Sequence, residues 1–405
     1  MKRIQFHTQA HYYLAMLIAF FIPLGRITPV FIVLFLLNWI IEGDFKNKFQ
    51  KIFQNKLSLL FIAFFLMHLI GLSYTENMDA GLFDLQVKLS LLVFPFILAS
   101  RPVSKTQIRD LFWAFIIGCV LCSFIMLSRA IYTYMAFSEN IFFYQAFSFI
   151  IHPSYLSMYF NLCIAWLLIS RLKKSATSNG FASILWFIVV LFFSFIIVLL
   201  SSKMGLITMI LLYIGFILYY ILSRKKYLFG LIGLLLFIGS VFSIVRFVPE
   251  IRGRVNNVFV AMSSNSTNQA EAESTAVRML IWSASNQIIS ERLLLGVGTG
   301  DSKDVLMTEY EKRGMTGAFE HKLNAHNEYY QVFISVGLIG FVLLILSLLL
   351  PLYKAFTSKN AIYILFLLII ILNFIPESMF ETQAGVVFYA FFNSLLCFDN
   401  NKSLV

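Results

Sequence analysis

The sequence predicts an all-α polytopic membrane protein with about twelve transmembrane helices and one large loop between the ninth and the tenth. Composition is the first indication, because the 405 residues are 60% hydrophobic and only 13% charged, with a mean hydropathy of +0.83. A soluble globular protein is about half apolar and about a quarter charged. Apolar runs long enough to cross a bilayer also recur along the chain, without the alternating segments of a β-barrel.

The predicted transmembrane segments follow one another through the whole chain, and we interpret residues 1–405 as one integral membrane domain. The first two segments are short, so we expect a tilted hairpin or a partly re-entrant pair there. The segments lie at about 11–25, 28–42, 57–73, 86–100, 109–130, 153–170, 181–200, 204–222, 227–245, 327–352, 360–376 and 383–398.

Loop charge predicts the orientation of these helices. Lysines and arginines concentrate in alternate loops, and the positive-inside rule places those loops and both termini in the cytoplasm. The short loops of the opposite set, with their helix ends, hold only Arg26, Lys88, Arg129 and Lys203. The long polar interval 246–326 therefore faces the periplasm of a bacterial inner membrane. The net charge of +11 is explained by the cytoplasmic loops and not by nucleic-acid binding.

The interval 246–326 carries the densest polar sequence of the chain. Residues 263–274 are rich in Ser, Asn, Thr, Ala and Glu, which predicts a mobile loop. Residues 277–290 have the spacing of an amphipathic helix, on which Arg278 and Trp282 share one side. The interval is too short for a full core of its own, so we expect it to lie on the ends of the transmembrane helices.

Two further features of the interval concern turns and helix ends. Asp301 or Ser302 is expected to cap a second helix that runs to about Arg313 and stops at Gly314. The glycine-rich run 296–300 lacks the lysine of a phosphate-binding loop, so it predicts a tight turn that lets the backbone approach a neighbour.

Metal and disulfide chemistry receive no support from the sequence. All four cysteines lie in apolar segments, and the outer acidic residues lack a metal-ligand pattern. We therefore predict no metal and no cofactor.

His326 is the candidate for acid–base chemistry, because it stands at the entrance of the tenth predicted span. An imidazole has an ordinary pKa of about 6.5, which suits a general base at neutral pH. Asn327 and Tyr330 are near enough in sequence to orient the ring or a substrate. The alternative is a histidine that caps the helix and hydrogen-bonds to the backbone.

Isolated cations on the outer side are candidates for binding an anion. Lys203 follows Ser201 and Ser202 in a very short turn, where it binds either an anion or lipid phosphate. Arg278 is either an anion clamp or the partner of a carboxylate at 271 or 273.

The weaker candidates of this kind stand nearer the middle of the chain. Arg129 is an isolated cation on the same poorly charged side. His152 precedes Pro153 at the start of the sixth span and either lines the same cavity or simply begins a helix.

The order of these features resembles the O-antigen ligase and O-antigen polymerase superfamily of bacterial envelope glycan enzymes. The span count and the place of the large loop agree with it, so the resemblance covers nearly the whole chain. Its motifs here are Ser-Ser-Lys at 201–203, Arg-x-x-x-Trp at 278–282, Gly-Val-Gly-x-Gly at 296–300 and His-Asn-x-Tyr at 326–329.

The resemblance implies a glycan donor on undecaprenyl diphosphate, used at the outer face of the inner membrane without nucleotide or metal. It implies that His326 acts on the acceptor hydroxyl and that Arg278 engages the diphosphate. Lys203 stands where many members carry arginine, which keeps the charge but loses the bidentate geometry. Trp282, Asn327, Tyr330, Arg129 and His152 are supporting candidates. A single displacement would invert the anomeric configuration.

Three functions remain open at this point. A ligase would join a finished glycan to an acceptor such as lipid A–core, whereas a polymerase would extend the glycan on its carrier. Both need the same donor site and base, and we favour the ligase. A polysaccharide transporter or flippase is the third interpretation, but the chain shows no clear internal repeat and its candidate residues gather at the outer face.

Overall fold

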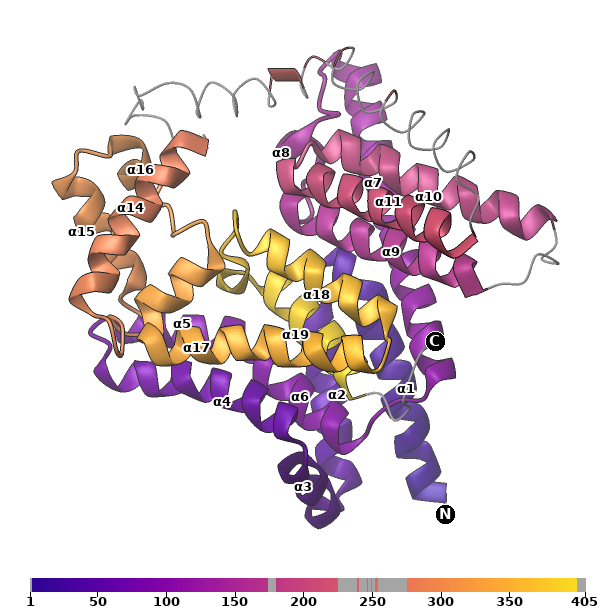
Figure 1. Cartoon of the computed structure of the whole chain (residues 1–405), viewed down its shortest axis with the longest axis horizontal. Coiled ribbons are helices and arrows are strands. Elements are labelled where there is room, and N and C mark those ends of the chain that lie inside the picture. Colours follow the sequence, from indigo (N-terminus) through magenta and orange to yellow (C-terminus); the bar gives the residue numbers. More distant parts are fainter. Residues whose placement is uncertain are drawn as a thin grey trace. The chain divides into compact units, whose positions relative to one another are not determined.

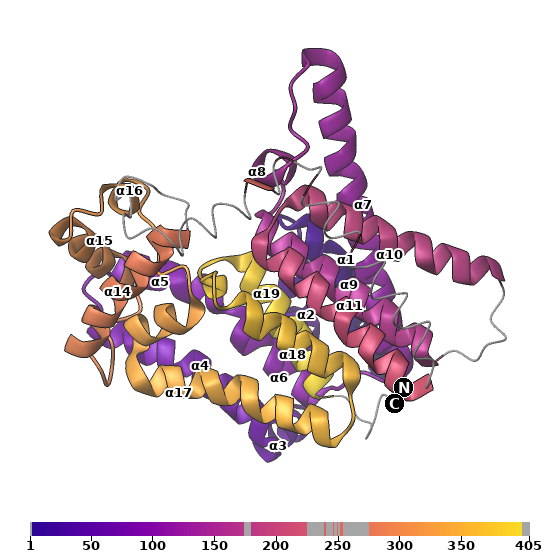
Figure 2. The same cartoon turned by 45° about the horizontal axis from the view of Figure 1, so that its top comes forward.

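The computed structural model describes residues 2–173, 180–224 and 275–398, with a few single positions between 239 and 253. All regular elements in these ranges are helices (Figures 1 and 2). Among them, seven are long and apolar enough to cross a membrane, or eight if one bent pair is counted as a span. The all-α membrane fold is confirmed. The predicted span 227–245 lies outside the described residues, and the count of about twelve stays a prediction.

Contacts divide the chain into two units. The first contains Met1–Leu121, Asn268–Glu273 and Val277–Val405, and the second contains Cys122–Thr267 and Ser274–Ala276. The helices of the second unit are the C-terminal part of α7 (Lys105–Phe137), α8 (Tyr144–Phe147), α9 (Pro153–Lys173), α10 (Gly180–Leu200) and α11 (Lys203–Arg224).

The first unit holds most of the remaining elements. Its helices are α1 (Lys2–Phe21), α2 (Thr28–Glu42), α3 (Phe45–Gln54), α4 (Lys56–Gly71), α5 (Met78–Lys88), α6 (Ser90–Ser100), the start of α7, nearly all of α14 (Thr275–Glu291), α15 (Ser302–Lys312), α16 (Thr316–Glu320), α17 (Glu328–Thr357), α18 (Ala361–Asn373) and α19 (Gln383–Cys397). Three short 3-10 turns, Ile22–Leu24, Leu72–Tyr74 and Met379–Glu381, join some of them.

Helix α18 is shorter than the predicted segment 360–376, whereas α19 agrees with the predicted segment 383–398 to within one residue. α18 has 13 residues and α19 has 15, whereas a span needs about 20 residues. The predicted segment 360–376 includes Pro376, but the helix ends at Asn373 and the chain then forms a loop, Phe374–Glu381. That loop is held by side chains from other helices, which explains why the apolar pattern overestimates α18.

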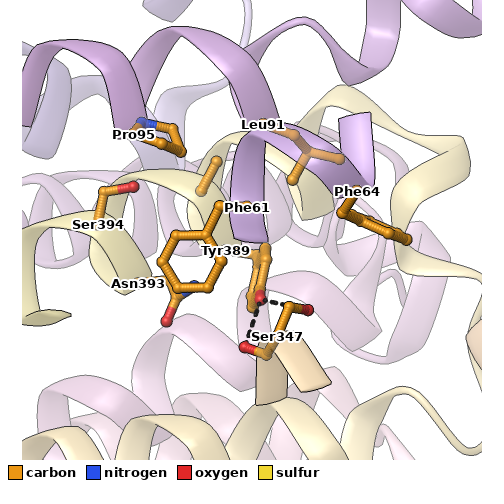
Figure 3. Close-up of a pocket in the computed structure, with 9 residues that line it drawn as sticks. Phe61, Phe64, Leu91, Pro95, Ser347, Tyr389, Asn393 and Ser394 are labelled. Carbon is orange, nitrogen blue, oxygen red and sulfur yellow. Dashed lines mark hydrogen bonds between the residues drawn. The ribbon is translucent and has the colours of Figure 1, made fainter. Parts of the chain in front are cut away.

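Helix packing in the first unit is tight and aromatic. α17 packs along α4, and α19 packs against α6. Figure 3 shows the cavity between these helices, where Tyr389 and Ser347 are hydrogen-bonded beside Phe61, Leu91 and Pro95. The cavity measures about 10 Å³, which is room for one water molecule at most. This cavity therefore leaves no space for a substrate.

A break in α17 fixes the polar interval to the transmembrane helices. Val336 and Gly337 have non-helical backbone angles, and Gly337 has a φ of +66°. The break exposes backbone groups that bond to the glycine-rich turn. Their hydrogen bonds run from Val297 N to Ile334 O (2.8 Å), from Gly298 N to Ser335 O (3.0 Å) and from Leu338 N to Leu293 O (2.8 Å). The prediction of a close backbone approach at 296–300 is confirmed.

The same turn also reaches the end of α4. Thr299 Oγ1 donates to His68 O at 2.6 Å, and Gly300 N donates to Thr75 Oγ1 at 3.2 Å. The Asp301 carboxylate accepts from Glu76 N and Asn77 N at 2.8 and 2.7 Å. The polar interval therefore docks on α4 and α17 together, as expected for a segment without a full core of its own.

We expect Gly296→Ala to destabilise the protein more than Gly43→Ala. Both glycines have a left-handed backbone, with φ of +74° and +76°, which costs an alanine about 1–2 kcal/mol. A Cβ at Gly296 would also lie 2.5 Å from Ile334 O, whereas a Cβ at Gly43 would meet nothing within 4 Å. Thermal unfolding of the purified variants measures the difference. Equal midpoints for the two variants would contradict the docking described above.

Candidate active site

The small helices of the polar interval share a compact core. α14 buries Val277, Ile281, Ala284 and Ile288, and Ile334 of α17 completes the cluster. The other buried members are Leu306, Tyr310, Met315, Ala318 and Ala325. The amphipathic helix predicted over 277–290 is thus confirmed, with slightly wider bounds, while the predicted loop 263–274 lies outside the described residues.

The first turn of α15 is not capped by the Asp301 side chain, in contrast to the prediction. Asp301 occupies the N-cap position, but its carboxylate makes no capping bond and binds the backbone at 76 and 77 instead. The helix ends at Lys312, and Gly314 follows with a φ of +68°. The predicted bounds are therefore right, whereas the capping role of Asp301 is wrong, because its side chain is used in a long-range contact.

His326 lies in a strained backbone position directly before α17. Its φ is +44°, in the left-handed region that few residues other than glycine adopt. The helix cap is Asn327, whose Oδ1 accepts from Tyr330 N at 3.2 Å. The alternative that His326 caps the helix is therefore wrong. A residue held in such a conformation costs about 1–3 kcal/mol, and such residues cluster at functional sites.

Trp282 holds the chain next to His326. Its Nε1 donates to Ala325 O at 3.1 Å, and its ring stacks on Tyr330 with centroids 6.1 Å apart and an interplanar angle of 19°. Ala325 N in turn donates to Gln331 Oε1 at 3.2 Å. The structure thus brings Trp282, His326, Asn327 and Tyr330 together, with α14 and the first turn of α17 as their supports.

Arg278 lies one turn before Trp282 on α14 and pairs with Glu377. The guanidinium and the carboxylate are 3.4 Å apart, and their side chains are 29% and 12% exposed. The partners expected from the sequence, at 271 and 273, lie outside the described residues. Because the guanidinium keeps access to solvent, it can exchange this carboxylate for another anion.

The loop Phe374–Glu381 is the part of the site that the sequence interpretation missed. Besides the Glu377 pair, Ser378 Oγ accepts from Asn327 N at 3.1 Å. Phe380 N donates to Glu328 Oε2 at 2.7 Å, and Glu328 N donates to Phe374 O at 2.8 Å. The sequence prediction considered only cations as ligand-binding residues. Two glutamates, Glu377 and Glu381, lie in a short break between two apolar segments, and this pattern could have predicted a polar site there.

Lys88 is not the isolated cation that the sequence predicts. The sequence presents it as isolated, but it is 2% exposed and pairs with Asp84 on its own helix and with Glu381 at 3.1 Å. Burial raises the pKa of the Glu381 carboxyl, and the Lys88 ammonium opposes that rise. Glu328, fully buried, lies close enough to share this electrostatic environment. The cluster anchors the loop that presents Glu377 and Ser378.

The other candidate residues belong to the second unit. Lys203 begins α11, and its Nζ donates to Thr275 Oγ1 at 3.1 Å. Arg129 donates to Ala146 O at 2.9 Å and lies over the Phe149 ring, 4.5 Å from its centroid. His152 contacts the rings of Tyr144 and Tyr155 before α9. Arg129 and His152 thus hold the α7–α9 connection together.

Several carboxylates in the described part of the chain form ion pairs, among them Glu377 with Arg278 and Glu381 with Lys88. No group of three His, Cys, Asp or Glu residues in these ranges is arranged to hold a metal ion. In the first unit, the groups that could contact a ligand are the imidazole of His326 and the guanidinium of Arg278.

Comparison with known families identifies the same region. Residues 187–345 match the family model described as O-antigen ligase, and this range contains Lys203, Arg278 and His326. The match supports the O-antigen ligase superfamily, as the sequence motifs predict. Members of this family are glycosyltransferase-like ligases and polymerases in membranes. No curated protein matches the chain.

We expect Lys88→Met to destabilise the first unit by up to about 3–5 kcal/mol, because it leaves the partly buried carboxylates of Asp84 and Glu381 without their counter-ion. Lys359→Met, at an exposed lysine, is the matched control. Thermal unfolding of both purified variants tests this expectation. Adding Glu381→Gln to Lys88→Met should restore part of the loss. An unchanged unfolding midpoint for Lys88→Met would show that the ion cluster does not anchor the loop.

Proposed function

Since the segment from α10 to α17 matches the O-antigen ligase family, we propose that this chain is a ligase-type glycosyltransferase. It transfers a glycan from undecaprenyl diphosphate to an acceptor hydroxyl, on lipid A–core or a similar molecule, at the outer face of the inner membrane. The observation that carries the proposal is the strained His326, held by Trp282 next to the Arg278–Glu377 pair.

His326 is proposed as the general base. The backbone before α17 is fixed on both sides, by Trp282 at Ala325 and by Ser378 at Asn327. A fixed imidazole can accept the proton of an acceptor hydroxyl as that oxygen attacks the anomeric carbon.

Arg278 is proposed to bind the diphosphate of the donor. Glu377 holds the guanidinium now, and a diphosphate that carries more negative charge would compete for it. Lys203 is proposed as a second cation for the same leaving group. As the glycosidic bond breaks, negative charge grows on the diphosphate, and fixed cations stabilise that growth.

The proposed reaction is one displacement. The acceptor oxygen forms a bond to the anomeric carbon, the bond to the diphosphate oxygen breaks, and His326 keeps the acceptor proton. Attack opposite the leaving group inverts the anomeric configuration. The donor carries its own activation, so neither a nucleotide nor a metal is required for the energetics. A polymerase would use the same groups with a growing glycan as the acceptor.

We expect His326→Asn to abolish glycan transfer while the protein still inserts and folds. Asparagine tolerates the left-handed backbone, so the variant removes the imidazole without adding strain. His321→Asn, at an exposed histidine five positions earlier, is the control and should keep full activity. The measurement is transfer from undecaprenyl-diphosphate-linked glycan to acceptor in proteoliposomes that contain equal amounts of each variant. Normal transfer by His326→Asn would exclude the base assignment.

Glycans in cells that lack this protein distinguish the two enzyme classes. Loss of a ligase leaves long polymer on the lipid carrier, whereas loss of a polymerase leaves single repeat units there. Accumulated single units would replace the proposed ligase by a polymerase. If loss of the protein changes neither the amount nor the length of the glycan on the lipid carrier, both the ligase and the polymerase assignments would be contradicted.

We expect Arg278→Ala to raise the KM for the lipid-linked donor by at least about tenfold, because a charge-assisted contact contributes about 1.5–3 kcal/mol. Arg278→Lys should raise it less, since the charge remains while the bidentate geometry is lost. Glu377→Gln should lower the KM, because it removes the competing carboxylate. If Arg278→Ala and Glu377→Gln both reduce stability and leave the KM unchanged, the pair is structural.

A further inference from the structure

α3 is an amphipathic helix that turns away from its neighbour. It follows α2 after Gly43 and Asp44, with a bend of 115° between the two helices. Phe45, Phe49 and Phe53 recur every four residues on one face, and their side chains are 42%, 38% and 65% exposed. Their rings form a continuous row, with successive centroids 6.4 and 6.3 Å apart. An apolar face edged by lysines is typical of a helix that lies in a membrane interface.

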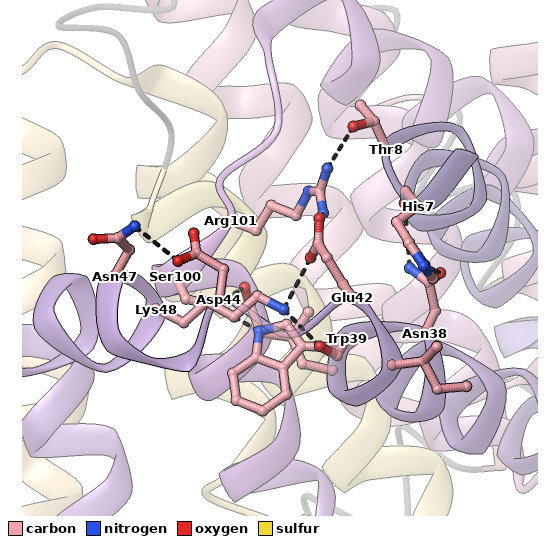
Figure 4. Close-up of polar contacts among 12 residues, drawn as sticks. His7, Thr8, Asn38, Trp39, Glu42, Asp44, Asn47, Lys48, Ser100 and Arg101 are labelled. Carbon is pink, nitrogen blue, oxygen red and sulfur yellow. Dashed lines mark hydrogen bonds and ion pairs between the residues drawn. The ribbon is translucent and has the colours of Figure 1, made fainter. Parts of the chain in front are cut away.

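The corner between α2 and α3 is held by buried polar contacts (Figure 4). Glu42 pairs with Lys48 at 2.9 Å and with Arg101. Lys48 Nζ also donates to Trp39 O at 2.5 Å, and Trp39 Nε1 donates to Ser100 Oγ at 2.8 Å. The direction of α3 is therefore fixed by the fold, and its phenylalanine row is presented at a set angle to α2.

A basic hollow opens next to this helix. Its volume is about 480 Å³. Lys51 and Lys56 are exposed, and in the described part of the chain neither forms an ion pair with a carboxylate. The lining consists of Lys51, Gln54, Asn55, Lys56, Ala99 and Pro102. Two ammonium groups and two amides next to Ala99 and Pro102 suit a phosphate group that is attached to a lipid.

We propose that this hollow binds the phosphate headgroup of an anionic phospholipid while the phenylalanine row of α3 packs among the acyl chains. Loop charge predicts that α3 lies on the cytoplasmic side, where anionic lipids give the membrane surface a negative potential. Lys48 takes no part in this binding, because its ammonium is already paired with Glu42 inside the protein. The site is separate from His326 and Arg278 and does not depend on the proposed transfer reaction.

Native mass spectrometry of the full chain with added lipid tests the proposal. The probes are phosphatidylglycerol and phosphatidylcholine of the same chain length, and the variant is Lys51→Gln with Lys56→Gln. Wild type should bind phosphatidylglycerol more tightly, and the double variant should lose about fivefold in affinity for each lysine removed. Its affinity for phosphatidylcholine should not change. Lys359→Gln, an exposed lysine on the same predicted side, should behave as wild type.

Three outcomes would overturn the site. Equal binding of the two lipids by wild type would remove its selectivity, and unchanged phosphatidylglycerol binding by the double variant would place the lipid elsewhere. Full displacement of the lipid by inorganic phosphate would show a site for free anions. Phe53→Ser should lower the affinity for both lipids equally, because it removes apolar contact and leaves the charges. Unchanged affinity for both lipids in this variant would also contradict the proposal.

Discussion

The structure of the first unit depends on a backbone seam between the glycine-rich turn and the break in α17. Helix interiors satisfy their own hydrogen bonds, so a polar segment can dock on a helix through its backbone only where that helix is interrupted. Val336 and Gly337 supply the interruption, and Leu293 to Gly298 supply the partner groups. The seam fixes the end of α14, and α14 carries Arg278 and Trp282. His326 is held in turn by Trp282, through Ala325.

The loop Phe374–Glu381 also fixes the geometry around His326. It contacts Arg278 through Glu377, Asn327 through Ser378 and Lys88 through Glu381, so three separate segments meet at one short loop. A buried charge cluster is an expensive anchor, because desolvation opposes every ionised group in it. Its use here is consistent with the need for fixed geometry around the proposed base His326, since small displacements of a catalytic base cost large factors in rate.

The loops that the charge pattern assigns to opposite sides of the membrane differ in their chemistry. On the predicted outer side, the short loops hold few cations, and two of these have specific contacts, Lys88 with Glu381 and Arg129 with Ala146. On the predicted cytoplasmic side, lysines such as Lys51 and Lys56 are exposed beside an aromatic helix. The first arrangement suits recognition of one anionic ligand in a defined place. The second suits attraction to a charged lipid surface.

The sequence by itself determined the all-α membrane class, the amphipathic α14 and the tight turn at 296–300, because apolar periodicity and glycine conformation are local properties of the chain. It also pointed to His326, and the family match to residues 187–345 agrees with the motifs that led there. Only the tertiary structure decided that Asn327 caps α17, that Glu377 holds Arg278 across 99 residues and that Glu381 meets Lys88 across 293. Such partners follow from which helices pack together, and no local pattern encodes that choice.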